Sequence, residues 1–195
     1  MATEAETLSK PSYLGLLNAI SLAETAAGTY LEAWADVTPN ENLACTLRLV
    51  AARERSHGDV FCRRIAELGF QLRRRVDPRN AEQLAKLSNP KISDLDKMPP
   101  RGAGDGDGFA DIRRRIADGE FDAMTANLMT WYIAEEKDSA KRLREAYDEV
   151  REGGRRKTAM GPDAPNADAE AMMACMTAGF ARLEKTLEKL VKAAK

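Results

Sequence analysis

The side chains best suited to chemistry are one histidine and a glutamate three residues before it. The chain contains a single histidine, His57, which closes the quartet Glu54-Arg55-Ser56-His57. Residues three apart lie on the same face of a helix, with their Cβ atoms about 5–6 Å apart. A carboxylate and an imidazole placed in this way are common ligands of iron, manganese and zinc. The spacing therefore favours a metal site.

The residues around this pair form a helical stripe that is otherwise apolar. The stripe runs through Leu43, Leu47, Val50, Glu54, His57, Phe61, Ile65 and Leu68. Because one face of such a helix turns towards the core, Glu54 and His57 are expected to point inward. Buried polar groups need a partner, so these two side chains call for further polar residues nearby.

Two other predicted helices each place one acid, Glu24 or Glu135, on their apolar stripe. Glu24 lies before Thr38 and Glu54 lies after it, at distances along a helix of roughly 21 and 24 Å from the same turn. Glu135 falls close to the midpoint of its own helix. Neighbouring helices of similar length bring their midpoints together, so the three carboxylates and the imidazole are expected to converge.

Three ionised carboxylates in a dry core carry a large desolvation cost, and a bound cation would offset it. The predicted metal ligands are Glu24, Glu54, His57 and Glu135. Iron is the first expectation for the ion, followed by manganese or zinc. Protons, waters or inward-reaching arginines are the alternative means of compensation. The arginines close enough in sequence are Arg53, Arg55 and Arg142.

Helical periodicity predicts an all-α fold with four long helices in one domain, 1–195. The helices are expected at about 12–37, 38–68, 118–152 and 166–194. A capping box that begins at Thr38 starts the second helix, and Gly69 ends it. Gly153 and Gly154 close the third helix. Such a set of helices packs as an antiparallel four-helix bundle.

The segment 70–117 lacks a helical period apart from a short amphipathic piece around 81–87, and it is rich in proline and glycine. We expect it to be a long crossover between the second and third helices, which carries the chain from one end of the bundle to the other.

The order of these residues resembles that of the ferritin-like superfamily, especially rubrerythrin-like bundles. The matching features are Glu24, the quartet that ends at His57, a long connection and then Glu135. They cover roughly 12–195. The resemblance implies a ferritin-like four-helix bundle whose two helix pairs each supply a lone Glu and a Glu-x-x-His motif. These ligands would hold two irons that react with oxygen or peroxide.

The second half of the chain departs from that pattern, because the fourth predicted helix contains Glu184 but no histidine. Three ligand sets stay open: a mononuclear site, a lopsided dinuclear site in which Asp138 replaces a histidine, and a relic without metal. Glu136 and Glu184 are additional candidate ligands. A rubredoxin module is excluded because it needs cysteine pairs.

The first functional hypothesis is therefore a non-haem metal-binding protein, and more specifically an oxidoreductase that acts with oxygen or peroxide. The alternative is a metal-free helical bundle that binds a partner or serves assembly. Iron storage in a ferritin-like cage ranks last. The small-molecule oxidant or substrate is not specified by any motif, and a homodimer is one expected assembly because dimers are common among symmetric bundles.

Composition limits the other partners and the location. The chain has 30 basic and 31 acidic residues, and this balance gives no pull towards nucleic acid or an anionic membrane. Neither a secretory signal nor an apolar run long enough to span a bilayer is present. Cys45, Cys62 and Cys175 are far apart and are expected to be reduced thiols, two of them in the core, which predicts a cytoplasmic protein.

Overall fold

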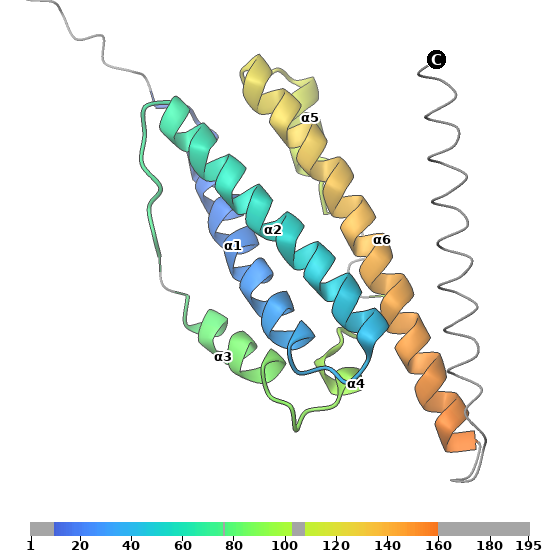
Figure 1. Ribbon diagram of the computed structural model, residues 1–195. Helices are drawn as coiled ribbons and strands as arrows, with labels where there is room; N and C mark the ends of the chain where they lie inside the picture. The colour runs from blue at the N-terminus through green and yellow to red at the C-terminus, as the bar shows by residue number, and fades with distance from the viewer. Residues whose placement is uncertain (1–9, 76, 103–107, 160–195) are drawn as a thin grey trace, which may run out of the picture. The chain divides into compact units, whose positions relative to one another are not determined.

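The computed structural model describes residues 10–75, 77–102 and 108–159, with side chains up to residue 153. These residues form helices and no strands, so the all-α prediction is confirmed for them (Figure 1). The helices are α1 (Leu14–Ala35), α2 (Glu41–Glu67), α3 (Pro78–Leu87), α4 (Asp94–Lys97), α5 (Ala110–Ala117) and α6 (Ala123–Ala159). The predicted helix 166–194 lies outside the described residues. The chain divides into two compact units, Met1–Gly153 and Gly154–Lys195, and all contacts below belong to the first.

Helices α1 and α2 pack side by side as an antiparallel hairpin, and glycines allow their close approach (Figure 1). A Cβ atom on Gly28 would lie 2.6 Å from Cγ of Arg55, and one on Gly58 would collide with Oγ1 of Thr25. The hydroxyl of Ser21 donates a hydrogen bond of 2.7 Å to the carbonyl of Gly58. This contact brings the middle of α1 against the middle of α2, where Glu54 and His57 lie.

The start of α2 differs from the predicted capping box. Asn40, and not Thr38, is the N-cap, and its side chain accepts a hydrogen bond of 3.0 Å from the backbone N–H of Leu43. The Thr38 hydroxyl instead donates to Asp94 Oδ2 at 2.7 Å. The predicted start at residue 38 is therefore wrong, because a carboxylate from the distant α4 binds the threonine.

The predicted end of α2 at Gly69 is confirmed. Gly69 has a φ of 84°, and the N–H of Phe70 donates to the carbonyl of Ile65 at 3.0 Å. These are the features of a Schellman motif, in which a left-handed residue satisfies the last carbonyls of a helix.

Helix α6 begins later and ends later than predicted. The expected start near residue 118 is the end of α5, which closes at Gly119 with a φ of 70°. The Asp122 carboxylate then accepts the backbone N–H of Thr125 at 3.1 Å, so the new helix starts there. Gly153 and Gly154 lie inside α6, which continues to Ala159. Glycine in a helix costs about 1 kcal/mol relative to alanine, and here that cost does not end the helix.

Contacts between α2 and α6 show that the two helices are antiparallel. Near the end of α2, Arg64 Nη2 lies 2.8 Å from Asp122 Oδ1, just before α6 begins. Further back along α2, Arg53 Nη1 lies 2.6 Å from Asp138 Oδ2, further forward along α6. Since α1 is antiparallel to α2, α6 runs in the same direction as α1.

The segment 70–117 is not a simple crossover, and the expectation that it changes ends is wrong. It leaves α2 close to the point where α6 starts, as the contact between Arg64 and Asp122 shows. In between it reaches the opposite end, where Trp34 Nε1 donates to Asp94 Oδ1 at 2.7 Å. The predicted helical piece around 81–87 is present in α3, whereas α4 and α5 have no counterpart in the prediction.

One apolar cluster lies at each end of the region formed by α1, α2 and α6, and the predicted metal ligands of α1 and α2 lie between the two clusters. The first cluster contains Tyr13, Leu17, Ile20, Phe61, Ile65, Phe121, Met129, Tyr132 and Ile133. The second contains Trp34, Ala35, Leu43, Leu47, Leu87, Met98, Ala146 and Tyr147. Glu24, Glu54 and His57 are buried in the stretch of α1 and α2 that separates these clusters.

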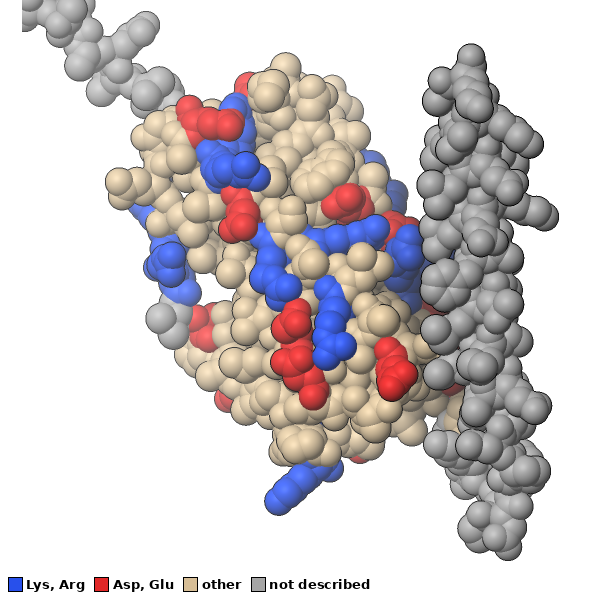
Figure 2. Space-filling model, viewed as in Figure 1, with Lys and Arg blue, Asp and Glu red and all other residues tan. Residues whose placement is uncertain are grey.

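The surface is consistent with the balanced composition. Figure 2 shows acidic and basic side chains interspersed on one face. Elsewhere among the described residues, acids and bases form ion pairs such as that of Arg55 with Glu32 at 3.1 Å. Cys45 is exposed and Cys62 is half-buried, so neither is a fully buried core thiol and the expectation of two core thiols is wrong. Cys175 lies outside the described residues. None of the described helices has the length and apolar character that a bilayer span requires.

Candidate metal centre

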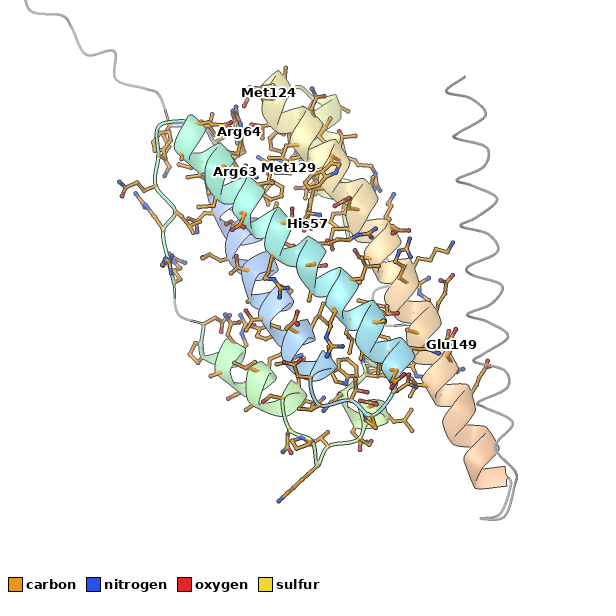
Figure 3. All side chains as sticks on the ribbon, in the orientation of Figure 1. His57, Arg63, Arg64, Met124, Met129 and Glu149 are labelled. Carbon is orange, nitrogen blue, oxygen red and sulfur yellow. The ribbon has the colours of Figure 1, made fainter. Side chains whose placement is uncertain are left out.

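Four side chains from three helices meet midway along the hairpin. Glu24 comes from α1, Glu54 and His57 come from α2, and Glu136 comes from α6. One ligand atom from each lies within 4.8 Å of the others. Figure 3 marks His57 in the middle of α2, distant from Glu149 near the far end of α6. One oxygen from each of three carboxylates and one ring nitrogen can thus surround a single ion.

The two nitrogens of the His57 ring face different groups. Nδ1 lies 3.2 Å from Glu136 Oε1 and 3.7 Å from Glu24 Oε2. Nε2 lies 2.9 Å from Glu135 Oε2 on the other edge of the ring. The ring is fully buried, so neither nitrogen reaches solvent. Nδ1 is therefore the ring nitrogen that faces the other candidate ligands, whereas Nε2 contacts Glu135.

Three buried atoms that face one another have no hydrogen-bond partner within the described part of the chain. They are Glu24 Oε2, His57 Nδ1 and Glu136 Oε1, each from a different helix. A buried polar atom without a partner costs about 1–3 kcal/mol, and more when it is charged. Once His57 has lost its extra proton, all three atoms carry lone pairs that they can donate to a metal ion. The donor set thus fits a metal ion.

The sequence placed Glu135 in the cluster, whereas the structure places Glu136 there. Glu24, Glu54 and His57 come together as expected. Glu135 is close to the cluster but contacts only the outer nitrogen of His57 among these residues. The two acids are neighbours on α6 and point about 100° apart, so a small error in helix phase exchanges them.

Burial and close contacts shift the pKa values of the cluster. Burial, followed by the neighbouring carboxyl of Glu24, raises the pKa of Glu54 to about 10. Burial lowers the pKa of His57, but the carboxylates of Glu136, Glu24 and Glu135 outweigh it and raise this pKa to about 10. Burial raises the pKa of Glu24, but His57, Glu54 and Tyr132 together bring it below its ordinary value. Protons thus partly neutralise the metal-free cluster.

Aromatic residues close the cluster on the α6 side. Tyr132 donates a hydrogen bond of 2.7 Å to Glu24 Oε1, which leaves Oε2 directed towards His57. Burial and this bond raise the pKa of Tyr132 well above its usual range. Trp131 packs edge-on against His57, with ring centroids 5.0 Å apart. Of these two neighbouring aromatic residues, Tyr132 is buried, whereas Trp131 is 38% exposed.

The arginines considered as alternative counter-charges are engaged elsewhere. Arg53 Nη1 and Arg142 Nε both donate to Asp138 Oδ2 at 2.6 Å. Arg55 donates to Glu32 Oε2 at 3.1 Å on the hairpin surface. The same contacts hold the Asp138 carboxylate in ion pairs, which argues against its use as a second-metal ligand. Glu184 lies outside the described residues.

Comparisons of this chain with protein-family models, curated proteins and solved structures found no match. The class that the described residues define is an all-α protein with a buried carboxylate–histidine cluster. The ferritin-like resemblance therefore depends on the sequence motifs alone.

Proposed function

We propose that the protein binds a metal ion through Glu24, Glu54, His57 and Glu136. The observation that carries this proposal is a set of three buried donor atoms from three helices that face one another without a hydrogen bond. His57 Nδ1 lies 3.2 Å from Glu136 Oε1 and 3.7 Å from Glu24 Oε2. Because all the oxygen donors are carboxylates and the nitrogen donor is an imidazole, iron is the first candidate, followed by manganese and zinc.

The protein's own contribution is a set of ligands held by supporting hydrogen bonds. Tyr132 fixes Glu24, and Glu135 fixes the His57 ring by accepting a hydrogen bond from Nε2–H. Such contacts to ligands orient them and raise metal affinity. Bound iron would supply one-electron chemistry with oxygen or peroxide, and we propose an oxidoreductase on this basis. The antiparallel four-helix bundle and the ferritin-like relationship belong to the same proposal.

The alternative function is a metal-free bundle that binds a partner. The observation that favours it is the raised pKa of Glu54 and of His57, both about 10, which allows protons to take over part of the role of a cation. The two candidates differ in metal content. They also differ in how substitution of His57 affects metal content. A protein whose buried carboxylates are neutralised by protons contains no ion that the substitution could remove.

The test is the metal content of full-length protein purified without chelators and then supplied with ferrous iron in air. We expect about one ion per chain and an absorption band from bound ferric iron. The variants His57→Ala and Glu136→Gln should lose the ion, while Glu149→Gln, an exposed change on the same helix, should retain it. Circular dichroism establishes that each variant is folded. Metal-free wild-type protein after this treatment would contradict the proposal.

A further inference from the structure

The charge of the cluster is not matched by a divalent ion. Its three carboxylates, Glu24, Glu54 and Glu136, carry three negative charges when all act as ligands. Neutral His57 supplies a nitrogen donor without charge. A divalent ion would leave a net charge of about −1 in the core, whereas a trivalent ion would leave none.

Within the part of the chain that the structure describes, the three arginines closest in sequence to the ligands do not supply the missing charge. The guanidinium groups of Arg53 and Arg142 form ion pairs with Asp138, and that of Arg55 forms an ion pair with Glu32. Glu135, on the outer nitrogen of His57, adds a further negative charge near the centre. The total charge around the proposed ion is therefore more negative than the charge of the three ligand carboxylates alone.

Burial makes this imbalance effective. His57 is 0% exposed, Glu54 is 6% exposed and Glu24 is 7% exposed. The side chain of Glu136 is 20% exposed and that of Glu135 is 32% exposed. Water therefore screens the charges of Glu24 and Glu54 poorly, and an ion interacts with these two carboxylates more strongly than it would at the surface. The unpartnered Nδ1 of the fully buried His57 points into the same space, so the acids are not merely a solvated cluster.

We propose that this site selects one trivalent metal ion, such as ferric iron, over divalent ions of similar size. This inference rests on the proposed metal binding and adds the charge of the ion to it. The four donor atoms surround one position, and the Asp138 carboxylate is held by two arginines, so a single ion is expected.

The experiment uses the redox-inert probes Ga³⁺, supplied as its citrate complex, and Zn²⁺, in competition titrations of the full chain. The measured quantity is the ratio of the two affinities, compared between wild type and Glu136→Gln. The amide keeps an oxygen donor but removes one charge, so the Ga³⁺ to Zn²⁺ ratio should fall by about tenfold or more. The control Glu149→Gln should leave this ratio unchanged.

The outcomes separate this inference from the proposed function. Binding of both ions with the same ratio in wild type and Glu136→Gln would overturn the selection for a trivalent ion and leave metal binding intact. Failure of both ions to bind the wild type would overturn metal binding, and the inference with it. Glu54→Gln provides a second charge-removing variant on α2 if Glu136→Gln does not fold.

Discussion

Glu135 Oε2 lies 2.9 Å from His57 Nε2, on the opposite edge of the ring from the nitrogen that faces Glu136. Two adjacent acids of α6 thus hold the two edges of one imidazole. The proposed roles differ: Glu136 is a ligand, and Glu135 is a positioning residue that fixes the ring and its proton.

Replacement of Glu135 by alanine tests this division of roles. We expect metal affinity to fall by about 10–100-fold, because partners of ligating histidines typically contribute that much. Glu135→Gln should lose less, since the amide oxygen still accepts a hydrogen bond from Nε2–H. Titration with Zn²⁺ measures both variants against Glu149→Ala. Complete loss of binding in Glu135→Ala, equal to that in His57→Ala, would instead identify Glu135 as a ligand.

Metal binding should release protons. In the metal-free protein the pKa values of Glu54 and His57 are both raised to about 10, so both groups hold a proton at pH 7. Each must lose that proton to act as a ligand, so we expect release of about two protons per ion, with affinity that rises with pH until about 10. A pH-stat titration measures the release, and Glu54→Gln should release about one proton fewer. Binding without proton release would contradict these assignments.

The hydrogen bond from Tyr132 to Glu24 should contribute to stability. Tyr132→Phe keeps the ring that packs against His57 and Phe61 but leaves Glu24 Oε1 without its donor. We expect a loss of about 1–3 kcal/mol in the free energy of unfolding, measured by urea denaturation of the metal-free protein. An unchanged urea midpoint would show that water or another residue replaces the hydroxyl.

The close contact between α1 and α2 predicts strong sensitivity at Gly58. A Cβ atom there would collide with Thr25 Oγ1 and lie 3.2 Å from the Ser21 carbonyl oxygen. Gly58→Ala should therefore destabilise the protein by about 1–3 kcal/mol. Gly15→Ala is the matched control, because a Cβ atom on Gly15 meets nothing within 4 Å and alanine favours helix. Equal thermal melting temperatures for the two variants would contradict the proposed packing.

Periodicity predicted the inward positions of α1 and α2 because their stripes are long and regular. Leu17, Ile20, Glu24 and Trp34 are all buried on one face of α1, as their spacing indicated. On α2 the same holds for Glu54 and His57. In these helices the polar residues could be recognised because the other positions on the same stripe, three or four residues away, are apolar.

The phase of α6 was harder to predict, because its outward face also carries apolar residues. Met124 is 65% exposed and Trp131 is 38% exposed, although both lie at helical spacing from Glu135, the acid predicted to point inward. The buried face instead includes Met129, Tyr132 and Ile133. The helix is thus rotated about its axis relative to the predicted orientation, and Glu136 rather than Glu135 reaches the cluster.

The connection between α2 and α6 could not be derived from local patterns. Asp94 holds this segment to the far end of the hairpin by accepting hydrogen bonds from Trp34 and Thr38. These partners are distant in sequence, and neither hydrogen bond leaves a periodic signal. The Thr38 hydroxyl donates to this carboxylate, and Asn40 is the N-cap of α2 in place of Thr38.

The most direct test of the central claim is the metal content of wild type and His57→Ala after identical loading with ferrous iron in air. We predict about one iron per wild-type chain and almost none in the variant, with both proteins folded by circular dichroism. Equal iron content in the two proteins, or none in either, would contradict a metal centre at Glu24, Glu54, His57 and Glu136.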